Sequence, residues 1–179
     1  MRYDGLDYVS SEHAFQAQLV QPRNRGIFER KSVFSKYSSG FEDLYKKADV
    51  AAKKVSFWKR KKNIGILAKM ISKRAWLEKR GIQKLRISEV ECESIFEGIL
   101  MAKYESNPEL KKILLDTGDR YLLEFDRAAG RLEKEGKRSR WGGMIVDGKV
   151  VGRNQMGALM MKVRERFKTA DAAKNEINV

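Results

Sequence analysis

Three acidic side chains stand where their surroundings suggest chemistry. Glu12 falls in the first turn of an expected helix that begins after Ser10 and Ser11, where the helix dipole favours a carboxylate even without a catalytic role. Glu124 and Asp126 alternate with apolar residues, which predicts that both lie on one face of a strand. Two carboxylates buried together would raise the pKa of one of them and suit general acid–base catalysis, whereas exposure to solvent is the more common arrangement.

The only histidine and the only cysteine are further candidates. His13 follows Glu12 directly, so its imidazole is placed either to orient a substrate by a hydrogen bond or, equally well, to lie in the core with its polar atoms satisfied. Cys92 has no second cysteine to pair with and no histidine nearby in sequence to generate a thiolate. Its apolar neighbours predict a structural thiol on the buried side of a helix.

The chain carries a strong excess of positive charge. Lys and Arg number 38 against 24 Asp and Glu, which gives a formal net charge of +14 and a pI near 9.9. Such a chain attracts polyanions, of which nucleic acid is the first candidate. Nucleotides and anionic surfaces are others, and a solvated basic face without a partner is the plain alternative.

The excess charge concentrates between about residues 23 and 86 and peaks at Lys59-Arg60-Lys61-Lys62, the basic cluster. Within this stretch we expect helices over about residues 41–58 and 64–80, the second ended by Gly81. Aromatic residues stand among the cations, and such an arrangement can stack on nucleic-acid bases. We favour the simpler interpretation that the aromatic rings pack against the domain while the lysines face water.

The rest of the pattern predicts further helices and a few extended segments. Helices are expected over about residues 11–21, 88–105, 107–116 and 154–167. Extended segments are expected at 1–9 and 121–126, together with a hairpin around Asp147-Gly148. A charged connector over 128–140 and a polar tail from Lys168 complete the pattern.

Some side chains within these elements have an expected orientation. Phe15 lies on the apolar side of the first helix, so it should be buried. Leu110, Ile113 and Leu114 are expected to face inward from the helix that begins at Pro108. Asn154 is expected to cap the last helix.

The segment Tyr8-Val9-Ser10-Ser11-Glu12-His13-Ala14-Phe15-Gln16-Ala17 resembles the signature of the NADAR (YbiA-like) N-glycosidase family. In that family a strand leads into a helix that opens with Ser-Glu-His, followed by an aromatic residue, Gln and Ala. Further similar blocks follow in the family's order and spread across most of the chain. They are Ala102-Lys103-Tyr104-Glu105 with Asn107-Pro108-Glu109-Leu110 and Leu114-Leu115; Thr117-Gly118 with Leu123-Glu124; and Trp141-Gly142 followed by Gly152, Asn154, Gly157, Leu159-Met160 and Val163-Arg164.

The resemblance implies a single α+β domain over residues 1–167, mostly helical with a small sheet. The basic stretch at about 23–86 is then an insertion, and residues 168–179 form a polar tail. The implied activity is hydrolysis of the bond between a base nitrogen and a ribose carbon, as in ADP-ribosyl-guanine or an early riboflavin-pathway intermediate, without a metal or a cofactor. Departure of the base builds positive charge on the ribose, and a carboxylate stabilises that charge or activates water.

By this resemblance Glu12 is the catalytic carboxylate. The residues that would line the substrate pocket are His13, Phe15, Glu124, Asp126, Trp141, Gly142 and Asn154. The indole of Trp141 would stack on a base, whereas capping of the last helix explains Asn154 fully. The basic cluster, Lys59, Arg60, Lys61 and Lys62, is the candidate contact with nucleic acid.

Some positions depart from the family pattern. The chain begins downstream of a Phe-Ser-Asn-Phe-type segment of the family, so we expect that part of the ligand pocket to be lacking. Arg138 stands where the family has an acidic residue, and Asp126 is the candidate replacement for that carboxylate. Ser88 stands where the family has a tryptophan, and Trp76 is its candidate replacement.

Two functions follow from these observations. The first is a hydrolase whose substrate is a nucleotide or ADP-ribosylated nucleic acid. The second is a non-enzymatic protein on the same scaffold that binds nucleic acid, or acts structurally, through its basic stretch; an oligomer or assembly contact is a further possibility. No segment approaches the about 20 apolar residues that span a bilayer. We therefore expect a soluble, cytoplasmic protein. The resemblance to the NADAR family implies a phage or bacterial origin, with a location in the host cytoplasm if the protein is viral.

Overall fold

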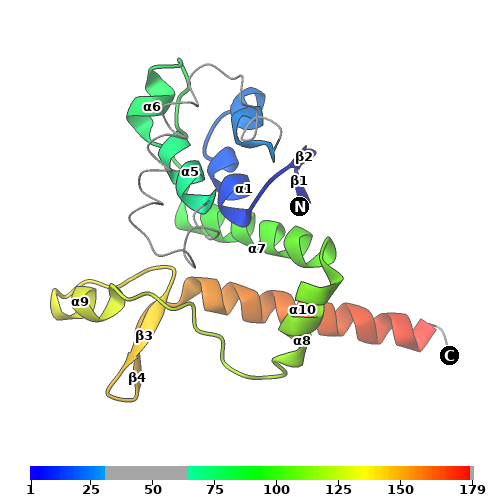
Figure 1. Cartoon of the computed structure of the whole chain (residues 1–179). Coiled ribbons are helices and arrows are strands. Elements are labelled where there is room, and N and C mark those ends of the chain that lie inside the picture. Colours follow the sequence, from blue (N-terminus) through cyan, green and yellow to red (C-terminus); the bar gives the residue numbers. More distant parts are fainter. Residues whose placement is uncertain (31–63, 178–179) are drawn as a thin grey trace. The chain divides into compact units, whose positions relative to one another are not determined.

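The structure is a computed structural model that describes residues 1–30 and 64–177 (Figure 1). The chain divides into two compact units, Met1–Ser106 and Asn107–Val179. Each unit combines helices with a small two-stranded antiparallel sheet, as expected of an α+β chain. The helix expected over 41–58 and the basic cluster lie outside the described residues. None of the helices in the described part is long and apolar enough to cross a membrane.

The first unit opens with a tight hairpin. Strand β1 (Arg2–Tyr3) pairs with β2 (Leu6–Asp7) across Asp4 and Gly5, whose positive φ angles of 50° and 78° suit a two-residue turn. The segment expected to be a short strand or edge around a turn signal at Asp4-Gly5 thus forms both strands of a hairpin, with its turn at these two residues. The described elements that follow in this unit are α1 (Ser11–Gln18), the 3-10 helix η1 (Pro22–Phe28), α5 (Ile64–Ile71), α6 (Arg74–Glu78) and α7 (Glu89–Glu105).

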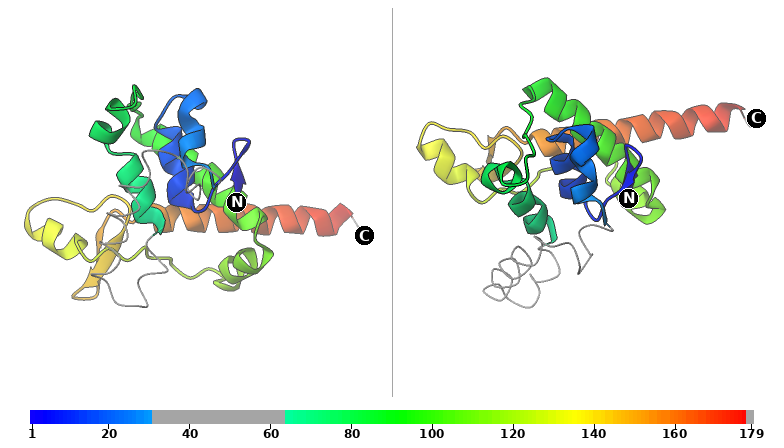
Figure 2. Two further views of the ribbon diagram at one scale, coloured as in Figure 1. Left: turned by 45° about the horizontal axis from the view of Figure 1, so that its top comes forward. Right: turned by 90° about the horizontal axis from the view of Figure 1, so that it is seen from above.

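Helix α1 begins where its capping residue predicts. The Ser10 side chain accepts a hydrogen bond from the backbone N–H of His13, which satisfies one of the free donors at the helix start. The helix ends at Gln18, and Pro22 opens η1, which lies beside α1 in Figures 1 and 2. The single helix expected over 64–80 is instead divided into α5 and α6 at Ser72.

Helix α7 supplies the floor on which α1 packs. Ser88 and Glu91 form a reciprocal capping box at its start. The Phe15 ring of α1 stacks on Phe96 of α7, with 4.0 Å between ring centroids and 19° between planes. Cys92 is buried in the same helix, as expected of a structural thiol.

The second unit contains a hairpin and one long helix. Its elements are α8 (Pro108–Asp116), α9 (Ala129–Lys134), β3 (Gly143–Val146), β4 (Lys149–Gly152) and α10 (Gln155–Ile177). The hairpin turns at Asp147-Gly148, as predicted, and pairs Gly143 with Gly152. Helix α10 continues without a break through 168–177, so the segment expected to be a tail is helical (Figure 2).

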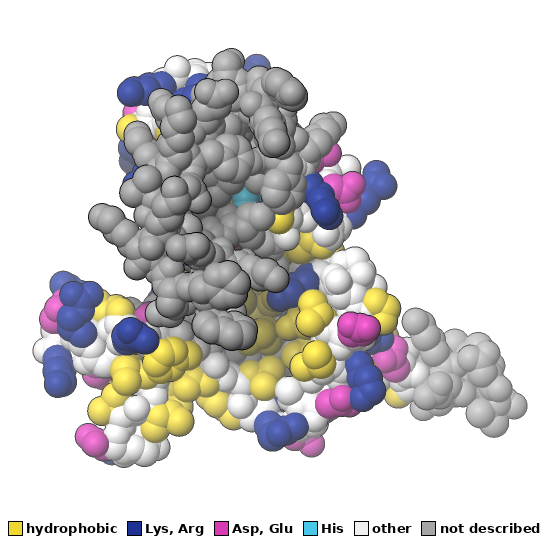
Figure 3. All heavy atoms as spheres, viewed as in Figure 1, with side chains coloured by type: hydrophobic (Ala, Val, Ile, Leu, Met, Phe, Trp, Pro, Cys, Tyr) yellow, Lys and Arg dark blue, Asp and Glu magenta, His cyan; other side chains and the backbone are white. Residues whose placement is uncertain are grey.

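The strand expected over 121–126 does not form. Only Phe125 makes a bridge, a parallel one with Gly143, supported by hydrogen bonds from Gly143 N to Glu124 O and from Asp126 N to Gly143 O. Phe125 is 65% exposed, so it does not face a core as the alternation predicted. Figure 3 shows apolar side chains gathered over the β3–β4 hairpin.

Asn154 explains why segment 121–126 stays irregular. Its Oδ1 accepts a hydrogen bond from Glu124 N (3.0 Å), and its Nδ2 donates to Leu122 O and to Tyr121 Oη (both 2.8 Å). The side chain therefore holds this segment instead of capping α10, which corrects the expectation. A Cβ on Gly157 would lie 2.1 Å from Leu122 O, so only glycine allows this close approach.

The inward face of α8 also differs from the prediction. Leu114 is buried, but Leu110 is exposed and Ile113 is 62% exposed. Instead, Lys111 lies over the Phe167 ring of α10, 4.7 Å from its centroid, and pairs with Asp171. A lysine stem thus covers apolar surface where leucine and isoleucine were expected.

We predict that Asn154→Ala lowers the free energy of unfolding by about 2 kcal/mol, because it leaves the amide of Glu124 and the carbonyl of Leu122 without their partner. Urea unfolding followed by circular dichroism measures this loss. Asn154→Asp is the matched control, since it keeps an acceptor for the Glu124 amide but faces the Leu122 carbonyl with a carboxylate. Unchanged stability in Asn154→Ala would contradict the role assigned to this side chain.

Candidate functional site

The predicted site residues fall in both units. Glu12, His13 and Phe15 belong to the first unit, whereas Glu124, Asp126, Trp141, Gly142 and Asn154 belong to the second.

Glu12 is held at the start of α1 with both carboxylate oxygens engaged. Oε1 accepts a hydrogen bond of 2.8 Å from Gln16 Nε2, one helical turn later, a spacing that places the two side chains on the same face. Oε2 lies 3.9 Å from Lys69 Nζ of α5. The side chain is 26% exposed, so the carboxylate is oriented by its neighbours and still reaches the surface.

A second lysine approaches from the segment that follows α6. Lys84 forms an antiparallel bridge with Val20, and Leu85 N donates to Leu19 O. The ammonium donates to Ser72 O at 3.0 Å, just beyond the end of α5, where helix carbonyls carry partial negative charge. Burial lowers the pKa of Lys84, repulsion from Arg74 lowers it further, and attraction to Glu12 acts in the opposite direction.

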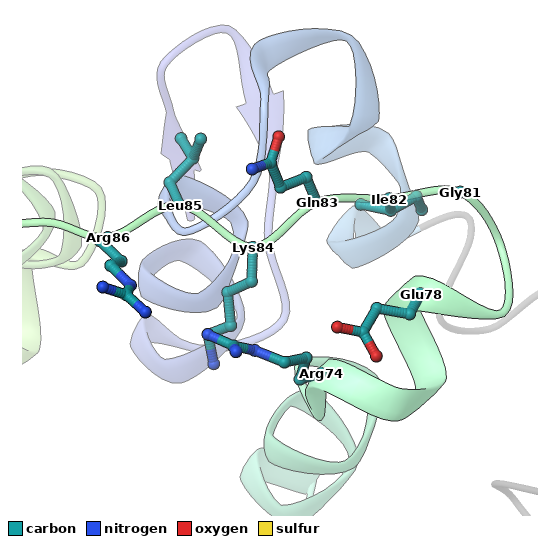
Figure 4. A pocket seen from close by; sticks show the side chains of 8 residues that line it. All are labelled: Arg74, Glu78, Gly81, Ile82, Gln83, Lys84, Leu85 and Arg86. Atoms are coloured by element: carbon teal, nitrogen blue, oxygen red, sulfur yellow. The ribbon is translucent and has the colours of Figure 1, made fainter.

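A pocket of about 670 Å³ opens beside Lys84, and Figure 4 shows its lining. The lining residues are Arg74, Glu78, Gly81, Ile82, Gln83, Lys84, Leu85 and Arg86. Cations outnumber the one lining carboxylate, so the wall of this pocket is basic. The sequence pattern does not indicate this pocket, because contacts between residues distant in sequence, Lys84 with Val20 and Leu85 with Leu19, bring the segment beside α1.

His13 is fully buried and is not a fully satisfied core histidine. Its Nδ1 lies 2.9 Å from Ser10 Oγ. That oxygen also accepts the His13 backbone N–H, so the serine hydroxyl links the imidazole to the helix start. Nε2 has no hydrogen-bond partner among the described residues. Burial lowers the pKa of His13 to about 4, so the ring is neutral at pH 7.

Phe15 and the two acidic residues of the second unit have structural surroundings. Phe15 is buried in its stack on Phe96. Asp126 accepts hydrogen bonds from the Ser139 hydroxyl and the Ala128 backbone N–H, and these bonds, chiefly that from Ser139, lower its pKa. The raised pKa that a buried carboxylate pair would produce is therefore absent from Asp126. The Glu124 side chain is exposed, as the common alternative predicted.

The Trp-Gly block is built into the scaffold of the second unit. The Arg140 guanidinium lies 4.5 Å from the Trp141 ring centroid, so it occupies one face of the half-buried indole. Arg140 is fixed by a hydrogen bond to the Gln155 side chain. A Cβ on Gly142 would lie 2.6 Å from Glu124 O, which requires glycine there. Arg138 is exposed.

Ser88 and Trp76, the expected departure in the first unit and its candidate replacement, also have local explanations. Ser88 caps α7, so a serine at this position serves the helix start. The Arg80 guanidinium lies 3.6 Å from the ring centroid of Trp76, the proposed replacement tryptophan. Arg80 therefore occupies one face of this indole. In the described part of the chain, no group of three or more His, Cys, Asp or Glu side chains is placed to hold a metal ion.

Comparison of the chain with protein-family models, with curated proteins and with solved structures finds no match. Its function must therefore be inferred from its own residues and their geometry.

We predict that His13 makes stability depend on pH. Because its pKa in the folded chain, about 4, lies below the ordinary value of 6.5, the unfolded chain binds more protons in this interval. The contribution of the neutral, buried His13 ring to the free energy of unfolding is complete above pH 6.5 and is lost as the pH falls toward 4. Between about pH 7.5 and pH 5 the wild type should lose about 2 kcal/mol more unfolding free energy than His13→Asn.

Urea unfolding at a series of pH values tests this prediction. The absolute stability of His13→Asn is not the readout, since the substitution also changes packing. Only the slope of the unfolding free energy against pH is compared between the wild type and His13→Asn. Parallel slopes would refute the assignment of this pH dependence to His13.

Proposed function

We propose that the chain is a NADAR-type N-glycosidase in which Glu12 is the catalytic residue. The resemblance of residues 8–17 to the family signature supports this proposal. The observation that carries it is the carboxylate of Glu12, which is oriented by Gln16 and Lys69 and remains partly exposed. A glutamate that served only the helix dipole would need no such orientation.

The reaction is hydrolysis of the bond between a base nitrogen and a ribose carbon. As this bond breaks, its electron pair stays on the base nitrogen and positive charge develops on the ribose. The Glu12 carboxylate stabilises that charge, or takes a proton from the water whose oxygen adds to the ribose carbon. The water loses one proton as its oxygen bonds to the ribose carbon, and the base nitrogen takes up one proton from solvent, which gives the free base and a ribosyl product.

His13 acts in this scheme as a positioning residue. Its ring is neutral at pH 7 and fully buried, so it is a poor source of the proton that the departing base needs. Its bond to Ser10 instead secures the start of α1, where Glu12 lies. A rigid helix start keeps the carboxylate in one orientation, which is what charge stabilisation requires.

The proposed substrates are negatively charged. ADP-ribosyl-guanine in nucleic acid and phosphorylated riboflavin-pathway intermediates both join a base to a ribose, and both carry phosphate. The net charge of +14 favours their capture. The basic cluster at Lys59 to Lys62 is the proposed nucleic-acid contact, although it lies outside the described residues.

A second candidate function is a non-enzymatic protein that uses the same scaffold to bind nucleic acid or to assemble. Its support is the state of Asp126, the candidate replacement for the acidic residue at Arg138. One Asp126 oxygen accepts a hydrogen bond from the Ala128 backbone N–H and the other from the Ser139 hydroxyl. Asp126 is therefore engaged within the second unit, which supports a scaffold that lacks a second catalytic carboxylate.

We predict that the wild type releases ADP-ribose from an oligonucleotide carrying ADP-ribosylated guanine, and that Glu12→Gln lowers the rate at least about 100-fold. Glu105→Gln is the matched control, because Glu105 is an exposed glutamate of the same unit. Chromatographic detection of free ADP-ribose measures the rate, and circular dichroism verifies folding. A riboflavin-pathway intermediate is assayed in parallel by release of its base.

The two candidate functions give opposite results. Full release by Glu12→Gln, or no release by the wild type from either substrate, would exclude the enzyme. The binding protein instead predicts salt-sensitive binding of nucleic acid that Glu12→Gln leaves unchanged and that replacement of Lys59, Arg60, Lys61 and Lys62 by Gln weakens.

A further inference from the structure

The basic pocket of the first unit draws its cations from two segments. Arg74 comes from α6, whereas Lys84 and Arg86 come from the extended segment after Gly81. Figure 4 shows the ends of the Arg74 and Lys84 side chains close to one another. Figure 3 shows Lys and Arg side chains on the surface around α6.

The fold holds these cations close together, and Glu78 is the one carboxylate that lines the pocket with them. Lys84 is fixed by its bridge to Val20 and by its hydrogen bond to Ser72 O. Within the described part of the chain, neither Arg74 nor Arg86 has an ion-pair partner. Burial lowers the pKa of Lys84, and repulsion from Arg74 lowers this pKa further. An anion between them would remove this repulsion.

The size and the composition of the pocket limit the kind of anion. A volume of about 670 Å³ exceeds what a single inorganic ion needs and is typical of pockets for small organic ligands. Two guanidinium groups can each donate a pair of hydrogen bonds to one phosphate group. Ile82 and Leu85 add apolar lining for a less polar part of the ligand.

Lys84 also connects the pocket with the candidate catalytic carboxylate. It lines the pocket, and it lies close enough to Glu12 for the carboxylate to influence its protonation. A phosphate group against Lys84 would therefore lie within the electrostatic reach of Glu12.

We propose that Arg74, Lys84 and Arg86 form a subsite for the phosphate or pyrophosphate group of a small nucleotide. The subsite itself is independent of catalysis. Its use, to hold the phosphate end of a substrate whose ribose lies at Glu12, rests on the function proposed above.

Binding measurements on the full chain test the subsite directly. ADP-ribose, pyrophosphate and adenosine are titrated by calorimetry at constant ionic strength. We expect ADP-ribose and pyrophosphate to bind and to compete with one another, and adenosine to bind at least about tenfold more weakly. Arg74→Gln and Lys84→Gln should each weaken ADP-ribose binding about tenfold.

Matched variants separate the subsite from general electrostatic attraction. Lys73→Gln removes one charge beside Arg74 but lies outside the pocket lining, so it should change the affinity less than twofold. Lys84→Arg should restore part of the affinity that Lys84→Gln loses. Arg74 is exposed, so its replacement tests the pocket even if Lys84→Gln destabilises the fold.

Several results would overturn the proposal. These are wild-type binding of neither ADP-ribose nor pyrophosphate, equal losses in Lys73→Gln and Arg74→Gln, and unchanged affinity in both pocket variants. A single-stranded oligonucleotide without ADP-ribose that displaces ADP-ribose at lower concentration would also overturn it, in favour of a nucleic-acid groove.

Binding that depends on Lys84 without hydrolysis would exclude the enzyme and keep the subsite. Hydrolysis with an unchanged KM in both pocket variants would exclude the subsite alone.

Discussion

The position of α1 depends on the stack between Phe15 and Phe96. This contact joins the helix that carries Glu12 to the long helix α7. Almost the whole of α1 is buried, from His13 to Gln18, and Glu12 lies at its accessible end. The helix therefore contributes to the core along its length and presents one carboxylate at its start. Any displacement of the stack would move Glu12 relative to Lys69 and Lys84.

Burial of α1 has an energetic cost that its sequence makes visible. His13 Nε2, Gln16 Oε1 and Gln18 Nε2 are buried without hydrogen-bond partners among the described residues. Each such group costs about 1–3 kcal/mol, and native structures contain few of them. A helix chosen only for packing would carry apolar residues at these positions. The side-chain amide of Gln16 donates a hydrogen bond to Glu12. A glutamine at this position instead fits a helix whose polar residues orient a carboxylate.

Local signals in the sequence predicted the ends of elements better than their packing. Ser10 caps its helix, and Asp147-Gly148 turns its hairpin, because the preferences of these residues act over a few neighbours. The conformation of residues 121–126 depends on Asn154, which is distant in sequence. The alternation of polar and apolar residues alone therefore predicted a strand that does not form. The pocket beside Lys84 escaped prediction for the same reason, since it depends on a bridge to Val20.

The described cations show why net charge alone could not locate a site. Some are paired with carboxylates, as Lys112 is with Asp116. Arg164 is buried and donates to Thr117 Oγ1 and to Arg120 O, so it holds a turn of the second unit. Arg74 and Arg86 have neither kind of partner within the described residues and face a pocket of ligand size. Cations that the fold brings close to one another around a pocket with a single lining carboxylate have a stronger requirement for an external anion than solvated lysines have.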